Sequence, residues 1–175
     1  MLGANVMIAI SKATESDLSQ LRELAVLAFA DEEHYKPVGA LPGGPPSHDS
    51  IQKHREWLNS MDYLKCTQDG EIIGSCILDI HLDRGTIHGI HVKPESMGKG
   101  IGSWILSEAQ RIYPQVASWI LETPDYAKRN HLFYEKNGFT LSGVTPIDTA
   151  LGFGFYIYKK IAQQGYCSRS KKQRG

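Results

Sequence analysis

The chain has 175 residues, of which 41% are hydrophobic and 22% charged, and its formal net charge is zero. This length and composition fit one domain with an ordinary packed core. No apolar run approaches the roughly 18 residues that a membrane-spanning helix needs, which argues against a membrane protein.

The first residues show neither the charged start nor the long apolar centre of a signal peptide. The three cysteines, Cys66, Cys76 and Cys167, lie too far apart for a zinc site or a disulfide framework. We therefore expect a soluble cytoplasmic protein without a metal, in which Cys76 is a small core residue.

Basic residues gather at the C-terminal end, where residues 159–175 hold six of them and no acid. A basic tail can bind nucleic acid. Because Ser, Gln and Gly separate these charges, we interpret residues 162–175 as a disordered solubilising tail. We expect residues 1–161 to form a single domain, and neither nucleic acid nor a membrane as its partner.

Apolar and β-branched residues predict seven strands, in chain order 6–12, 63–67, 71–81, 86–92, 116–121, 139–144 and 153–161. Apolar residues at helical spacing predict four helices, at 14–30, 51–58, 100–113 and 124–137. Thr14 is the expected N-cap of the first helix, with Asp17 where a capping box usually has Glu. Hairpins mixed with helix crossovers indicate an α/β (α+β) fold with a mixed sheet and helices on its faces.

The segment 31–50, between the first two helices, holds four prolines, three glycines and two histidines. This composition predicts a largely irregular backbone. A loop of this length inside a compact domain is usually functional or mobile.

Three glycines at alternate positions, Gly98, Gly100 and Gly102, lie between the fourth predicted strand and the third helix. Glycine lets a ligand approach the backbone closely, and the helix that follows directs its free N–H groups into the turn. The pattern predicts a site for phosphate or pyrophosphate. A P-loop is excluded because Gly100, not Ser or Thr, follows Lys99, and the spacing also differs from a dinucleotide-binding motif.

Residues 92–94 (VKP) and 97–102 (MGKGIG) together resemble the signature of the GNAT superfamily of N-acetyltransferases, Gln/Arg-x-x-Gly-x-Gly/Ala after a strand. Met97 stands where the family usually has Gln or Arg. Residues 133–139 (FYEKNGF) are similar to a second family segment, Phe-Tyr-x-Lys-x-Gly-Phe. The resemblance covers residues 6–161 and implies a mostly antiparallel sheet of about seven strands, about four helices and a splayed strand pair at the cofactor site.

The resemblance implies acetyl-CoA as donor, with CoA as product, and direct attack by a primary amine in a ternary complex. It also implies that the backbone N–H of Ile90 stabilises the oxyanion and that Tyr134 is the general acid for the leaving thiolate. The implied cofactor contacts are Ile90, His91, Val92, Met97, Gly98, Lys99, Gly100, Ile101, Gly102, Ser103, Asn130 and Tyr134.

The acceptor, a small-molecule or peptide amine, must be neutral to attack, so a base or a water chain is needed. The candidate bases are Glu122, Asp79, His81 and His88. Residues of the irregular segment expected in the acceptor pocket, unless they are simply solvated, are Glu32, Glu33, His34 and Tyr35. Three alternatives stay open: a non-catalytic acyl-CoA-binding regulatory module, a transferase that uses a longer acyl-CoA, and a nucleic-acid-associated protein that acts through its tail. A homodimer is one assembly that the resemblance implies.

Overall fold

The computed structural model describes residues 7–41 and 44–162, so almost all of the predicted basic tail lies outside the described residues. The strands are β1 (Ile8–Lys12), β2 (Asp62–Gln68), β3 (Glu71–His81), β4 (Arg84–Val92), β5 (Ser118–Pro124), β6 (Thr140–Val144) and β7 (Phe155–Ile161). The α-helices are α1 (Leu18–Glu32), α2 (Ile51–Ser60), α3 (Ile101–Ile112) and α4 (Lys128–Lys136). In the described part of the chain, no helix is long and apolar enough to cross a bilayer.

All seven strands form one sheet in the order β1-β2-β3-β4-β5-β7-β6. The β4–β5 pair is parallel, whereas the other neighbouring pairs are antiparallel. The predicted mixed, mostly antiparallel fold is confirmed. The sheet order adds that β7 lies between β5 and β6, although β6 comes first in the chain.

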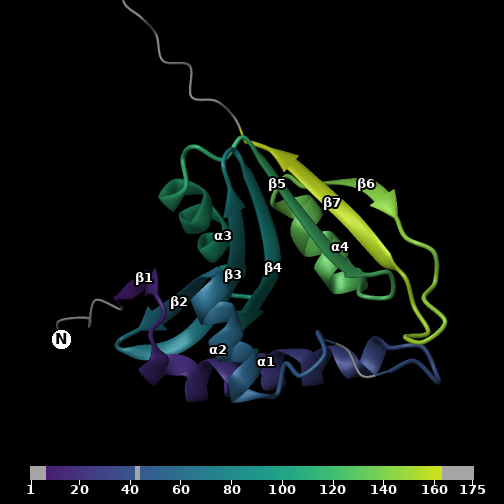
Figure 1. Ribbon diagram of the computed structural model, residues 1–175, viewed down its shortest axis with the longest axis horizontal. Coiled ribbons are helices and arrows are strands. Elements are labelled where there is room, and N and C mark those ends of the chain that lie inside the picture. The colour runs from purple at the N-terminus through teal and green to yellow at the C-terminus, as the bar shows by residue number, and fades with distance from the viewer. Residues whose placement is uncertain (1–6, 42–43, 163–175) are drawn as a thin grey trace, which may run out of the picture.

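Helices cover both faces of the sheet (Figure 1). Helices α1 and α2 pack on β2, β3 and β4, where one apolar cluster contains Leu21, Leu24, Trp57 and Ile77. The larger cluster joins the opposite face to α3 and α4, and Cys76 is fully buried in it, as predicted. Strand β3 is accordingly buried on both faces from Ile72 to Leu78.

Two local differences from the predicted elements bear on the site. Helix α1 runs on to Glu32, past the predicted end at residue 30, which places Glu32 at the end of a helix. Pro124, predicted in the first turn of a helix, is instead the last residue of β5, opposite Phe155. The predicted capping box is present, since the Thr14 N–H donates to Asp17 Oδ2 at 2.8 Å, but it caps a 3-10 turn (Glu15–Asp17) that precedes α1, whose own N-cap is Asp17.

The β4–β5 pair is short and depends on one glycine. Only Arg84 to Ile87 pair with β5, and Gly85 lies opposite Trp119. A Cβ atom built on Gly85 would lie 2.5 Å from the ring of Trp119. The fully buried indole therefore occupies the space that any side chain at position 85 would need.

We predict that Gly85→Ala destabilises the protein by about 1–3 kcal/mol, because the added methyl group overpacks the core against Trp119. Urea unfolding of the variant and the wild type measures the difference. The matched control is Gly143→Ala in β6, where the new Cβ would make an ordinary 3.4 Å contact with Ile157. Equal losses in the two variants would contradict the prediction.

Candidate functional site

The candidate site is a gap between β4 and β5. The two strands stop pairing after Ile87 and Leu121, although β4 continues to Val92 and β5 to Pro124. Figure 1 shows the two strands diverging toward α1. A parallel sheet normally continues its hydrogen bonds along both strands, so this separation leaves backbone groups available to a ligand.

The pairing of β4 with β3 decides which backbone groups face the gap. The Lys93 N–H donates to the Ile73 oxygen at 2.9 Å, and His91 lies opposite Ser75. Hydrogen-bonded positions alternate in an antiparallel pair. The backbone N–H and C=O groups of His91 are therefore directed at β3, whereas those of Ile90 and Val92 are directed into the gap.

A bulge lies at the point where the strands separate. Ile77 pairs with Gly89 and Leu78 with Ile87, so His88 is an extra residue in β4. Bulges bend a strand and increase its twist. The bulge therefore helps to turn the end of β4 away from β5.

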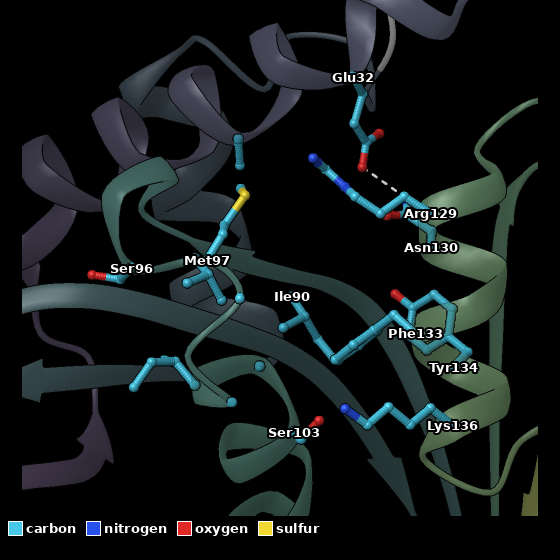
Figure 2. Close-up of a pocket in the computed structure, with 16 residues that line it drawn as sticks. Glu32, Ile90, Ser96, Met97, Ser103, Arg129, Asn130, Phe133, Tyr134 and Lys136 are labelled. Atoms are coloured by element: carbon cyan, nitrogen blue, oxygen red, sulfur yellow. Dashed lines mark hydrogen bonds between the residues drawn. The ribbon is translucent and has the colours of Figure 1, made fainter.

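The gap opens into a cleft of about 340 Å³ (Figure 2). Its lining comes from α1, β4, the glycine turn, α3 and α4. The lining residues are Ala28, Glu32, Ile90, Val92, Ser96, Met97, Gly98, Gly100, Ile101, Gly102, Ser103, Arg129, Asn130, Phe133, Tyr134 and Lys136.

The glycine turn has the conformation that an anion site needs. Gly98 and Gly100 have φ angles of 72° and 82°, and Gly100 is the N-cap of α3. A Cβ at Gly102 would lie 3.0 Å from the ring of Phe133, so glycine also allows α4 to pack closely here. The first N–H groups of the 12-residue α3 open into the cleft and favour negative charge.

Two basic side chains of α4 line the cleft at different ends, Arg129 beside Glu32 and Lys136 beside the start of α3 (Figure 2). Arg129 and Lys136 line it, and Figure 2 shows Lys136 extending toward Ser103 at the start of α3. Sequence reasoning did not assign a role to either residue. Lys136 could have been found from its place in the FYEKNGF segment, whereas the position of Arg129 depends on how α4 packs.

Tyr134 lies across the cleft from Ile90, on the opposite wall (Figure 2). Its side chain is buried, and burial raises the pKa of its hydroxyl, with a further contribution from the charge of Glu32. The phenol therefore keeps its proton at neutral pH. A protonated hydroxyl at this place can donate to a group that develops negative charge.

Glu32 connects the cleft to a second cavity of about 490 Å³. Its Oε1 accepts a hydrogen bond of 2.7 Å from Asn130 Nδ2. Tyr35 and Tyr126 line the second cavity beside it, and the Tyr126 hydroxyl is buried without a hydrogen-bond partner. Burial and the nearby charges of Glu32, Glu33 and Asp125 raise the pKa of Tyr126 to about 12.

The structure brings most of the predicted site residues together. Of the predicted cofactor contacts, the cleft lining lacks only the side chains of His91, which points toward α1, and Lys99, which is exposed. Of the predicted acceptor residues, Glu32 and Tyr35 line a cavity, whereas Glu33 pairs with Lys36 at 2.8 Å and His34 is exposed.

None of the four candidate bases lines either cavity. The side chains of Glu122, Asp79, His81 and His88 are all exposed. Among the described residues, Glu32 is the one carboxylate in the two linings. No group of three or more metal-ligating side chains occurs in residues 7–41 and 44–162.

Comparisons with known proteins agree with this geometry. Residues 60–141 match the family model of the acetyltransferase (GNAT) domain. No curated protein matches the chain. Similar solved structures include the ribosomal-protein-S18-alanine N-acetyltransferase from Escherichia coli, with a TM-score of 0.71 and 20% identity over 92% of this chain and 98% of that one. The PaiA N-acetyltransferase from Thermoplasma acidophilum, solved in complex with coenzyme A, has a TM-score of 0.70 and 21% identity over 89% and 99%.

We predict that Gly100→Ala weakens CoA binding about 5- to 30-fold, because a left-handed conformation costs an L-residue about 1–2 kcal/mol and the turn would relax. Titration calorimetry with CoA measures the change. The matched control is Gly70→Ala in the β2–β3 hairpin, which has a φ of 88° and equally open surroundings. The control should lose stability but keep its affinity for CoA; the same affinity in both variants would show that the turn does not bind the ligand.

Proposed function

We propose that the chain, whose residues 60–141 match the family model of the acetyltransferase (GNAT) domain, transfers the acetyl group of acetyl-CoA to a primary amine. The observation that carries the proposal is the edge of β4 that faces the cleft. The backbone groups of Ile90 and Val92 form one wall of the cleft. The glycine turn lies at one end of this wall, and Tyr134 lies on the wall opposite.

The cleft fits the donor along its length. The glycine turn and the N-terminus of α3 suit the pyrophosphate, and Lys136 adds positive charge there. The two amides of pantetheine can pair with the free backbone groups of Ile90 and Val92, as a peptide pairs with an exposed strand. Acetyl-CoA would supply the thioester that the amine attacks.

Two groups of the chain would then act on the reaction. The N–H of Ile90 donates to the thioester oxygen and stabilises the negative charge that forms when the C–N bond is made. Tyr134 donates its proton to the sulfur as the C–S bond breaks, which releases CoA as a thiol, and the proton that the nitrogen loses after the C–N bond is made restores the Tyr134 hydroxyl. The raised pKa of Tyr134 keeps this proton available at neutral pH.

Glu32 is the residue that we assign to the acceptor amine. It lines both cavities, and its charge affects the pKa of Tyr134 and of Tyr126 on either side. A carboxylate there would attract the ammonium form and could accept a proton from it before attack. Lys128 and Arg129 also line the second cavity, so an acceptor that carries an anionic group beside its amine would meet charges of both signs.

The deciding experiment is a screen of primary amines with acetyl-CoA that detects released thiol and confirms the acetylated product by mass spectrometry. The panel pairs polyamines with amino acids and short peptides, so that the effect of an acceptor carboxylate is measured directly. Binding of acetyl-CoA without product from any amine would favour the non-catalytic acyl-CoA-binding module. Faster transfer from propionyl-CoA or a longer thioester would identify a different donor.

We predict that Tyr134→Phe lowers kcat about 100-fold or more while the dissociation constant for acetyl-CoA changes less than about twofold, because only proton donation to the sulfur is lost. The matched control is Tyr158→Phe, which removes the neighbouring hydroxyl that donates to Glu135 at 2.9 Å. The control should keep wild-type turnover. Equal turnover in wild type and Tyr134→Phe would remove the role of Tyr134 as the acid.

We predict that Glu32→Gln raises the KM for a cationic acceptor about tenfold, since a neutral amide no longer attracts the ammonium group. The KM for acetyl-CoA should stay within about twofold. Glu33→Gln is the matched control, because the next residue carries the same charge but pairs with Lys36 and lines neither cavity. A rise of the same size in the control would show that general charge, not Glu32, binds the acceptor.

A further inference from the structure

One hydrogen bond connects the two helical layers at the boundary between the cleft and the second cavity. Glu32 ends α1, which covers one face of the sheet, and Asn130 lies in the first turn of α4, which covers the other. Asn130 Nδ2 donates to Glu32 Oε1 at 2.7 Å (Figure 2). Among the described residues, Glu32, Arg129 and Asn130 line both cavities. The bond therefore lies where the two cavities meet.

The charge of Glu32 decides how the Asn130 amide is turned. A carboxylate can only accept hydrogen bonds, so Asn130 must direct its NH2 group, and not its oxygen, at Glu32. The same nitrogen lies 3.4 Å from the hydroxyl oxygen of Thr123, a buried residue of β5. The amide nitrogen, which carries two hydrogens, therefore has one partner on α1 and one on β5.

The start of α4 is anchored to the end of β5. The Asn130 N–H donates to the Ala127 oxygen at 2.9 Å. The buried His131 beside it donates through Nε2 to the Pro124 oxygen at 2.9 Å, since a carbonyl oxygen can only accept. The ring of His131 also stacks on Tyr156 of β7, with 4.6 Å between the ring centroids. Asn130 therefore presents its amide from a fixed part of the backbone.

Glu32 lies in a less regular part of the chain. It is the last residue of α1, and a 3-10 turn (Glu33–Tyr35) follows it directly. A glutamate side chain has three torsions, of which the last is broad, so its carboxylate takes up many positions unless partners restrict it. The bond from Asn130 restricts the Glu32 carboxylate to the boundary of the two cavities.

The carboxylate held at this boundary acts on both cavities. Burial raises the pKa of Tyr134 in the cleft and of Tyr126 in the second cavity, and the charge of Glu32 contributes to both shifts. An ammonium group in the second cavity would meet this carboxylate before its nitrogen reached a thioester beside Ile90. The place of the carboxylate therefore decides where an acceptor amine is held.

We propose that Asn130 is a positioning residue: it holds the Glu32 carboxylate at the boundary of the two cavities, where that carboxylate binds the acceptor amine. The assignment rests on the proposed function of Glu32. It differs from the resemblance, which implies that Asn130 contacts the donor. The reason for the difference is that the amide nitrogen of Asn130 is already engaged by Glu32 and Thr123.

The first test compares Asn130→Ala and Asn130→Leu with the wild type in the full chain, using the amine that the screen identifies. Both variants lose the N–H donor, whereas leucine keeps about the volume of asparagine. Each should raise the KM for the amine about fivefold and leave the KM for acetyl-CoA within about twofold, because β4 and the glycine turn are intact. An unchanged amine KM in Asn130→Leu, or a rise of about tenfold in the KM for acetyl-CoA, would overturn the proposal.

The double variant Glu32→Gln/Asn130→Ala tests whether Asn130 acts through Glu32. Once the charge of Glu32 is gone, Asn130 has no carboxylate to position. The amine KM of the double variant should therefore stay within about twofold of the higher single variant. Two single effects that multiply in full would show independent roles and overturn the assignment.

The matched control is Asn137→Ala on the same helix. It removes a side-chain amide that donates to the Phe133 oxygen at 2.8 Å and lines neither cavity. The control should keep both KM values. A rise of the amine KM as large as in Asn130→Ala would make the effect a general property of α4 and overturn the assignment.

A second readout needs no activity and separates this proposal from the proposed function. Urea unfolding of Glu32→Ala, Asn130→Ala and the double variant measures their coupling. The double variant should raise the unfolding equilibrium constant at least about fivefold less than the product of the single effects, because both changes break one bond to a charged group. Asn130→Ala combined with Glu33→Ala should show no coupling, since Glu33 pairs with Lys36.

Calorimetry with CoA completes the readout. Asn130→Ala should bind CoA within about twofold of the wild type, because its amide is assigned to Glu32 and not to the donor. A loss of about tenfold in CoA affinity, or unfolding without coupling between Glu32 and Asn130, would overturn the proposal. A wild-type protein that acetylates no amine would count against the proposed function alone, and these two measurements would still decide whether Asn130 holds Glu32.

Discussion

The end of pairing between β4 and β5 is the constraint on which the rest of the site depends. Trp119 fills the space beside Gly85 and holds the two strands together up to Ile87. Past that point the strands separate, and alternation along β4 turns the polar groups of Ile90 into the gap. Buried backbone groups without partners are costly, so such an edge is stable only where a ligand or water completes it. The fold thus contains a place for an extended amide-bearing ligand before any side chain is considered.

The walls of the cleft follow from the same separation. Because only a short connection and the glycine turn separate β4 from α3, the N-terminus of α3 lies beyond the open edge. Helix α4, which follows β5, then carries Tyr134 to the other wall. The close contact of Gly102 with Phe133 sets how near α3 and α4 can approach. The groups that we propose for charge binding, oxyanion stabilisation and proton donation therefore lie in one line, in the order that a nucleotide thioester presents its groups.

Much of the donor side could be predicted because its signals are local. The glycines at 98, 100 and 102 have both the conformations and the close contact that their spacing indicated, and strands and helices agree with prediction to within a few residues. The error at Pro124 has a physical cause: proline suits the first turn of a helix and also the end of a strand, and pairing of β5 with β7 decides between them. Pairing between strands distant in the sequence carries no local signal, which is also why the place of β7 was not foreseen.

The acceptor side depends on contacts that are distant in the sequence. Glu32 reaches Asn130 from a helix that precedes it by 98 residues. The loop after α1 meets the β6–β7 loop, where the Leu41 N–H donates to the Leu151 oxygen at 2.9 Å and a Cβ on Gly152 would lie 3.0 Å from Ala40. Phe153 of that second loop packs edge-on against Tyr126, which lines the second cavity. Changes in either loop can therefore reshape the acceptor cavity while the strand gap and the glycine turn stay as they are. Under the proposed function, the fold therefore fixes the donor site, whereas the choice of amine depends on these two loops.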